Sequence, residues 1–95
     1  MEQQQEEMRR KLAEITVEAE SGSGAIRVKA NANREILDIV IDREILDLDD
    51  TEELQDLLIA AVNGALEKAH VKEQAEAQKM ISNMMPPGLG GLFGQ

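Results

Sequence analysis

Apolar and polar residues alternate on both sides of a Ser-Gly-Ser-Gly stretch at residues 21–24, and this pattern constrains the fold most strongly. A period of two places successive side chains on opposite faces of a strand, so residues 15–20 and 25–31 are predicted to form an antiparallel hairpin. Glycine in the first central position favours a two-residue type II′ turn. The resulting register pairs Val17 with Val28 on one apolar face.

A second turn near residues 32–33 is expected to bring in a third strand over residues 35–42. In the register of that turn, Leu37 faces Val28 on the apolar side. Residues 25–31 then form the middle strand of a three-stranded antiparallel meander.

The polar face of this predicted sheet carries two basic side chains. In the predicted registers Arg27 lies between Glu18 and Asp38, which neutralise it, whereas Lys29 faces no acidic neighbour. Lys29 is therefore a candidate for contact with a partner.

Helix-forming residues lie on both sides of the predicted sheet. Residues 2–14 are rich in Glu, Gln, Met and Arg and predict a first helix. A second helix is expected to begin after Asp50, which forms a capping-box-like pair with Glu53, and to continue to about Met84. Its broad apolar stripe comprises Leu54, Leu57, Leu58, Ala61, Val62, Ala65, Leu66 and Ala69. Gly64 lies within this stripe and indicates a close approach of another backbone.

These elements predict an α+β fold of the order α-β-β-β-α, with one domain over residues 1–85 and a flexible Pro/Gly-rich tail over residues 86–95. With one aromatic residue in 95, the core is thin, and domains this small commonly gain burial by oligomerising. Ile36 and Val40 also place apolar side chains on the polar face of the outer strand. We therefore expect a homodimer in which a second subunit covers this strand.

The residue inventory argues against an enzyme. The chain has no cysteine, which excludes a disulfide framework and a thiolate nucleophile. The single histidine, His70, has no carboxylate pair at metal-ligand spacing, and the acidic run 47–53 lacks the spacing of a calcium loop. We expect no catalytic, metal or cofactor site. The sequence shows no signal peptide or membrane span, so a cytoplasmic protein is expected.

The net charge of −9 is distributed unevenly along the chain. The stretch 35–56 contains ten acidic residues and one basic residue, whereas residues 1–34 and 57–95 are each neutral overall. An acidic protein is a poor match for a nucleic acid, because phosphate binding requires basic side chains. Here the entire excess lies in one block, so the net charge does not exclude such a partner.

Basic side chains cluster on both predicted helices. Lys68, Lys72 and Lys79 fall within about 40° of one another around the second helix, and Arg9, Arg10 and Lys11 are consecutive on the first. A solvated helix surface explains these clusters, and so does a phosphate-binding surface that a dimer would double.

Three segments together resemble the YbaB/EbfC family of bacterial nucleoid-associated proteins. They are ESGSGAIRVKAN at residues 20–31, IVIDREIL at residues 39–46 and ELQDLLIAAVNGA at residues 53–65, followed by the Pro86-Pro87-Gly88 ending. The similarity extends from about residue 6 to that ending.

The resemblance implies a homodimer with helices that project like the arms of tweezers. It also implies binding to double-stranded DNA in the nucleoid, without catalysis, cofactor, small-molecule substrate or membrane, and a role in chromosome organisation or gene regulation. The family's DNA contacts are attributed to the helices, which here gives Arg9, Arg10, Lys11, Lys68, Lys72 and Lys79. Lys29 joins them as the free base on the sheet.

A second hypothesis belongs to another functional class. The acidic block 35–56 and the Met/Gly-rich ending suit an adaptor that binds a basic polypeptide. Reversing the charge of Asp47, Asp49 and Asp50 would abolish that interaction, unless these residues serve only to cap the second helix.

Overall fold

The computed structural model describes residues 2–84 and shows two helices and a three-stranded antiparallel sheet. The elements are α1 (Glu2–Glu14), β1 (Thr16–Ser21), β2 (Ile26–Asn31), β3 (Ile36–Ile41) and α2 (Thr51–Met84). This order confirms the predicted α-β-β-β-α fold, with β2 in the middle of the sheet. The predicted tail at residues 86–95 lies outside the described residues.

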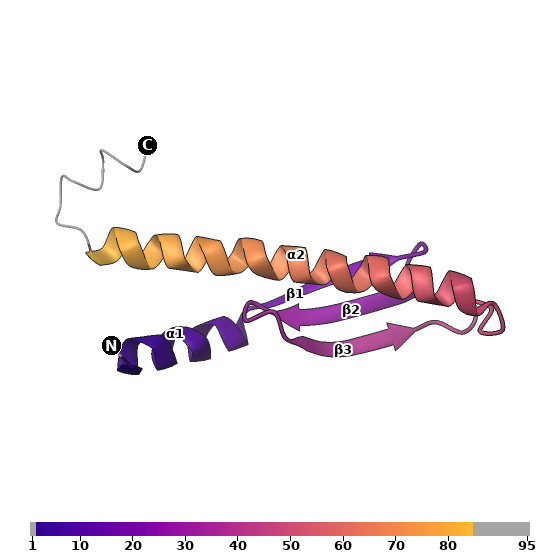
Figure 1. The fold of residues 1–95 in the computed structure, drawn as a ribbon, viewed down its shortest axis with the longest axis horizontal. Helices are drawn as coiled ribbons and strands as arrows, with labels where there is room; N and C mark the ends of the chain where they lie inside the picture. The colour runs from indigo at the N-terminus through magenta and orange to yellow at the C-terminus, as the bar shows by residue number, and fades with distance from the viewer. Residues whose placement is uncertain (1, 85–95) are drawn as a thin grey trace.

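The long helix α2 passes both the sheet and α1 (Figure 1). Its N-terminal half lies along the sheet, and its C-terminal half extends beyond the sheet beside α1. The loop that joins β3 to α2 lies at the opposite end from α1. No helix within residues 2–84 is both long enough and apolar enough to cross a membrane.

The core forms where α2 crosses β1 and β2. Ile26 and Val28 are fully buried, and they face a row of alanines at positions 61, 65 and 69 that are also fully buried. Small side chains in this row allow the helix to approach the sheet closely. A Cβ at Gly64 would lie 3.2 Å from the Cβ of Ala19, so the glycine marks a close approach, as predicted, but to a side chain of β1 and not to another backbone. The helix begins as expected, because Asp50 Oδ1 accepts a hydrogen bond of 3.1 Å from the Glu53 amide.

The predicted hairpin register is wrong by two residues. Val17 pairs with Ala30 and not with Val28, because the loop contains four residues in place of two. The strand continues to Ser21, whose hydroxyl donates to the Leu57 carbonyl at 2.7 Å. The loop then runs through three residues of positive φ, two of them glycines, which the type II′ turn did not anticipate. A shift of two keeps every side chain on its predicted face.

The register of β3 differs from the prediction in the same way. Val28 pairs with Ile39 and not with Leu37, and an irregularity between Lys29 and Ala30 places Ile36 opposite Ala30. Ile36 therefore lies opposite an apolar residue, contrary to its predicted place on the polar face. The turn before β3 spans residues 32–35, again two residues longer than predicted.

These shifts exchange the neighbours of the two bases on the sheet. Arg27 lies 3.8 Å from Glu20 and opposite Val40, so it is not flanked by Glu18 and Asp38 as predicted. Those two acids lie opposite Lys29 instead. Lys29 therefore has two acidic register neighbours, contrary to the prediction.

The outer strand β3 exposes apolar side chains. All six of its residues are exposed, although Ile39 and Ile41 pair with the fully buried Val28 and Ile26. The helix α2 covers β1 and β2 and makes few contacts with β3. Val40 is 51 % exposed on the polar face of the sheet. The chain thus leaves an apolar strand uncovered at the edge of its sheet.

Candidate nucleic-acid interface

Lysines from both helices meet at one carboxylate beyond the end of the sheet. Lys11 of α1 lies 3.1 Å from Glu76 Oε1, and Lys79 of α2 lies 3.2 Å from Glu76 Oε2. The side chain of Glu76 is only 10 % exposed, whereas the two lysine side chains are 62 % and 68 % exposed. The fold therefore brings together two of the predicted DNA-binding residues, and it presents both to solvent.

This arrangement favours the ionised form of Glu76. The Lys11 ammonium group, 3.1 Å from Glu76 Oε1, lowers the pKa of Glu76 below its usual value, and the hydrogen bond from Lys79 to Oε2 lowers it further. Partial removal from solvent opposes these effects without reversing them. The three side chains together carry a net positive charge.

Glu76→Gln is expected to lower the thermal unfolding midpoint at neutral pH and to have little effect at low pH. Because folding lowers the pKa of Glu76, its stabilising effect is complete above the pKa of an unfolded glutamate, about 4.3. The effect is lost as the pH falls through the lower pKa of the folded state. Thermal unfolding of both proteins across this range measures the difference. A difference that persists unchanged into the acidic range would contradict the assignment.

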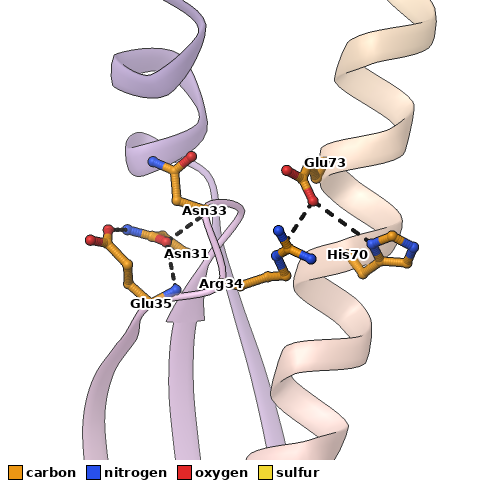
Figure 2. Close-up of polar contacts among 6 residues, drawn as sticks. All are labelled: Asn31, Asn33, Arg34, Glu35, His70 and Glu73. Carbon is orange, nitrogen blue, oxygen red and sulfur yellow. Dashed lines mark hydrogen bonds and ion pairs between the residues drawn. The ribbon is translucent and has the colours of Figure 1, made fainter. Parts of the chain in front are cut away.

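The turn between β2 and β3 joins both helices to the sheet (Figure 2). Asn31, which is buried, accepts hydrogen bonds from the amides of Asn33 and Glu35 and donates to the Glu35 carboxylate at 2.7 Å. Asn33 Nδ2 donates to the Arg9 carbonyl of α1 at 2.9 Å. Arg34, at φ 63°, extends toward α2 and lies 3.6 Å from Glu73.

Arg34 is a basic residue that the sequence did not single out. It lines a cleft of about 510 Å³ together with Arg9, Arg10 and the two acids Glu35 and Glu73. The residue pattern predicts neither the left-handed backbone conformation of Arg34 nor its position next to α2. The charges of Arg34 and Glu73 offset each other within this cleft.

The remaining predicted residues are dispersed over the surface. Lys68 donates to the Glu18 carbonyl of β1 at 2.8 Å, and Lys72 is exposed one turn further along α2. Arg10 lies 3.8 Å from Glu6 on the exposed side of α1. Lys29 lies on the sheet face opposite α2. The structure therefore groups Lys11 with Lys79 and separates Lys29 from the helical residues.

His70 lies on the surface of α2. Its side chain is 51 % exposed, and Nδ1 lies 3.7 Å from Glu73 Oε1, which also faces Arg34 (Figure 2).

Comparison with known proteins identifies the family to which the sequence is similar. The model of the YbaB/EbfC DNA-binding family matches residues 1–84. A nucleoid-associated protein of Thermodesulfovibrio yellowstonii is 46 % identical over 84 residues, which cover 85 % of this chain and 74 % of that protein. A nucleoid-associated protein of Acetivibrio thermocellus is 44 % identical over 94 residues, covering 99 % of this chain and 79 % of the relative.

A solved structure has a similar fold. The crystal structure of an uncharacterized protein from Helicobacter pylori matches with a TM-score of 0.68 at 25 % sequence identity. The match covers 84 % of this chain and 93 % of that protein.

Proposed function

Because the chain belongs to the YbaB/EbfC DNA-binding family, we propose that it is a nucleoid-associated protein that binds duplex DNA as a homodimer. The family match over residues 1–84 is the observation that carries this proposal. Binding occurs mainly through phosphates and involves no catalysis or cofactor. The role that follows is chromosome organisation or gene regulation in the cytoplasm of a bacterium, at the nucleoid.

The positions of the charges support phosphate contact at the helical end. Nine of the ten acidic residues in block 35–56 follow Glu35, and most of the block lies on β3 and on the loop and first turn that lead into α2. That loop is at the opposite end of the molecule from α1 (Figure 1). The proposed contacts on the helices, which lie away from this loop, are Arg9, Arg10, Lys11, Lys68, Lys72 and Lys79. Phosphate binding at the helical end therefore keeps DNA far from most of the acidic excess.

The uncovered strand β3 supports the homodimer. Ile39, Val40 and Ile41 are 43 %, 51 % and 36 % exposed, and Ile45 in the following loop is 56 % exposed. Burial of such a strand against a second copy removes both its apolar surface and its unpaired edge from water. A dimer also doubles each basic cluster and sets the two copies at a fixed spacing, which strengthens binding to a repeating phosphate backbone.

The adaptor hypothesis has weaker support. Asp47 Oδ1 accepts a hydrogen bond from the Asp49 amide at 3.0 Å, and Asp50 Oδ1 caps α2 through the Glu53 amide. Two of the three aspartates proposed for a basic partner therefore have a local structural role. The Met/Gly-rich ending lies outside the described residues.

Binding of the intact protein to two duplexes of unrelated sequence tests the proposed function. Phosphate contacts carry no sequence information, so we expect similar affinities for both duplexes at low salt. Light scattering is expected to give a mass of twice 10.5 kDa. A mass near 10.5 kDa would refute the dimer, and no binding to either duplex at micromolar protein would refute the DNA-binding function.

A further inference from the structure

We propose that Glu76 is a positioning residue for DNA binding: its carboxylate holds Lys11 and Lys79 together as a two-lysine phosphate site between α1 and α2. This inference rests on the proposed function and identifies what fixes the geometry of one contact. An acidic residue in a DNA-binding surface ordinarily repels phosphate. Here the structure assigns it the opposite effect.

The geometry leaves both lysines available to a phosphate. Each ammonium group has three N–H donors, and the contacts at 3.1 and 3.2 Å engage each group with one carboxylate. The lysine side chains remain 62 % and 68 % exposed, so their other donors face solvent. Each ammonium group can therefore bind a phosphate oxygen while it remains in contact with Glu76.

The burial of Glu76 prevents a phosphate from simply replacing it. Its side chain is 10 % exposed, and a carboxylate in such a place loses more than a surface carboxylate does when its positive partners leave. Lys11 and Lys79 therefore stay with Glu76 when DNA binds. Their positions are set before binding, which reduces the entropy lost when the contact forms.

Glu76 also sets the position of α1 relative to the distal part of α2. Beyond Ala69, Glu76 is the only buried residue of α2 within residues 2–84. The groove beside it has a volume of about 310 Å³ and is lined by residues of both helices, among them Met8 and Met80, with Glu7 as its other acidic residue. The Lys11–Glu76 ion pair therefore ties α1 to this part of α2.

Glu76→Gln tests the assignment, because the two possible roles predict opposite signs. Removing a repulsive charge would strengthen DNA binding. Releasing the lysines is expected to weaken DNA binding about tenfold near 0.1 M salt. The slope of the logarithm of the association constant against the logarithm of the salt concentration is expected to fall in magnitude by about 1, the value of one phosphate contact. Glu67→Gln removes the same charge from an exposed position on the same helix and is the matched control. We expect unchanged or tighter binding for this control.

A Lys79→Met background separates positioning from a general effect on the fold. Lys11 still neutralises Glu76 in this background, so the fold is retained, as circular dichroism can verify. If Glu76 acts through the lysines, Glu76→Gln is expected to reduce the DNA affinity of the Lys79→Met protein by roughly threefold or less, because one of the two lysines that Glu76 positions is already missing. An undiminished tenfold loss would overturn the inference.

The outcomes also separate this inference from the proposed function. Tighter binding by Glu76→Gln than by the unmodified protein overturns the inference alone. Failure of the unmodified protein to bind DNA overturns the proposed function and the inference with it.

Discussion

Simultaneous replacement of Lys68, Lys72 and Lys79 by glutamate is expected to reduce the affinity for duplex DNA about a thousandfold near 0.1 M salt. Each lost phosphate contact costs roughly tenfold at this salt concentration through counterion release, and the new carboxylates add repulsion. A titration of labelled duplex by fluorescence anisotropy measures the loss. Unchanged binding would exclude these lysines as DNA contacts.

Two further variants keep this result interpretable. Lys79→Glu places a second acid beside Glu76, so a triple glutamine variant provides a version with less repulsion. The matched control combines Thr51→Glu, Gln55→Glu and Asn63→Asp, three exposed positions in the half of α2 that follows the acidic loop. This control changes the net charge by the same amount as the triple glutamine variant. We expect the glutamine variant to lose most of its affinity and the matched control to retain most of it.

Ile39→Lys combined with Val40→Lys is expected to produce a monomer that binds DNA at least about a hundredfold more weakly. The two residues lie on opposite faces of β3, so the pair introduces charge on whichever face a second copy covers. Loss of the dimer removes the linked second binding surface, which is worth about 10²- to 10⁴-fold in affinity. Light scattering gives the mass, and anisotropy gives the affinity.

The lysine substitutions make this experiment stringent. Added positive charge would by itself strengthen phosphate binding, so a loss of affinity isolates the contribution of the dimer. Val71→Lys, at a position 59 % exposed on α2, is the control that adds charge away from β3. A double variant that keeps the dimer mass would show that β3 is not the interface.

Residue periodicity predicted the fold well because each element has a strong local signal. The switch from period two to helical spacing identified every strand and helix, and Asp50 with Glu53 correctly located the start of α2. The turns were less predictable. Gly22 is compatible with both a two-residue and a four-residue loop, and the choice depends on Ser21 and Leu57, which lie far apart in sequence.

The candidate site was predicted in part. The sequence identified Lys11 and Lys79 as basic residues of separate helices and did not single out Glu76. The structure instead shows Glu76 between the two lysines, because α1 packs beside the distal part of α2. The sequence did not indicate Arg34 for the same reason, because only the tertiary fold brings it near its partner Glu73.

The salt dependence of DNA binding by the unmodified dimer tests the central claim most directly. If phosphate contacts dominate, the logarithm of the association constant falls linearly with the logarithm of the salt concentration, with a slope steeper than about −4 for a dimer that makes five or more contacts. A slope near zero, or no binding at micromolar protein and low salt, would contradict the account.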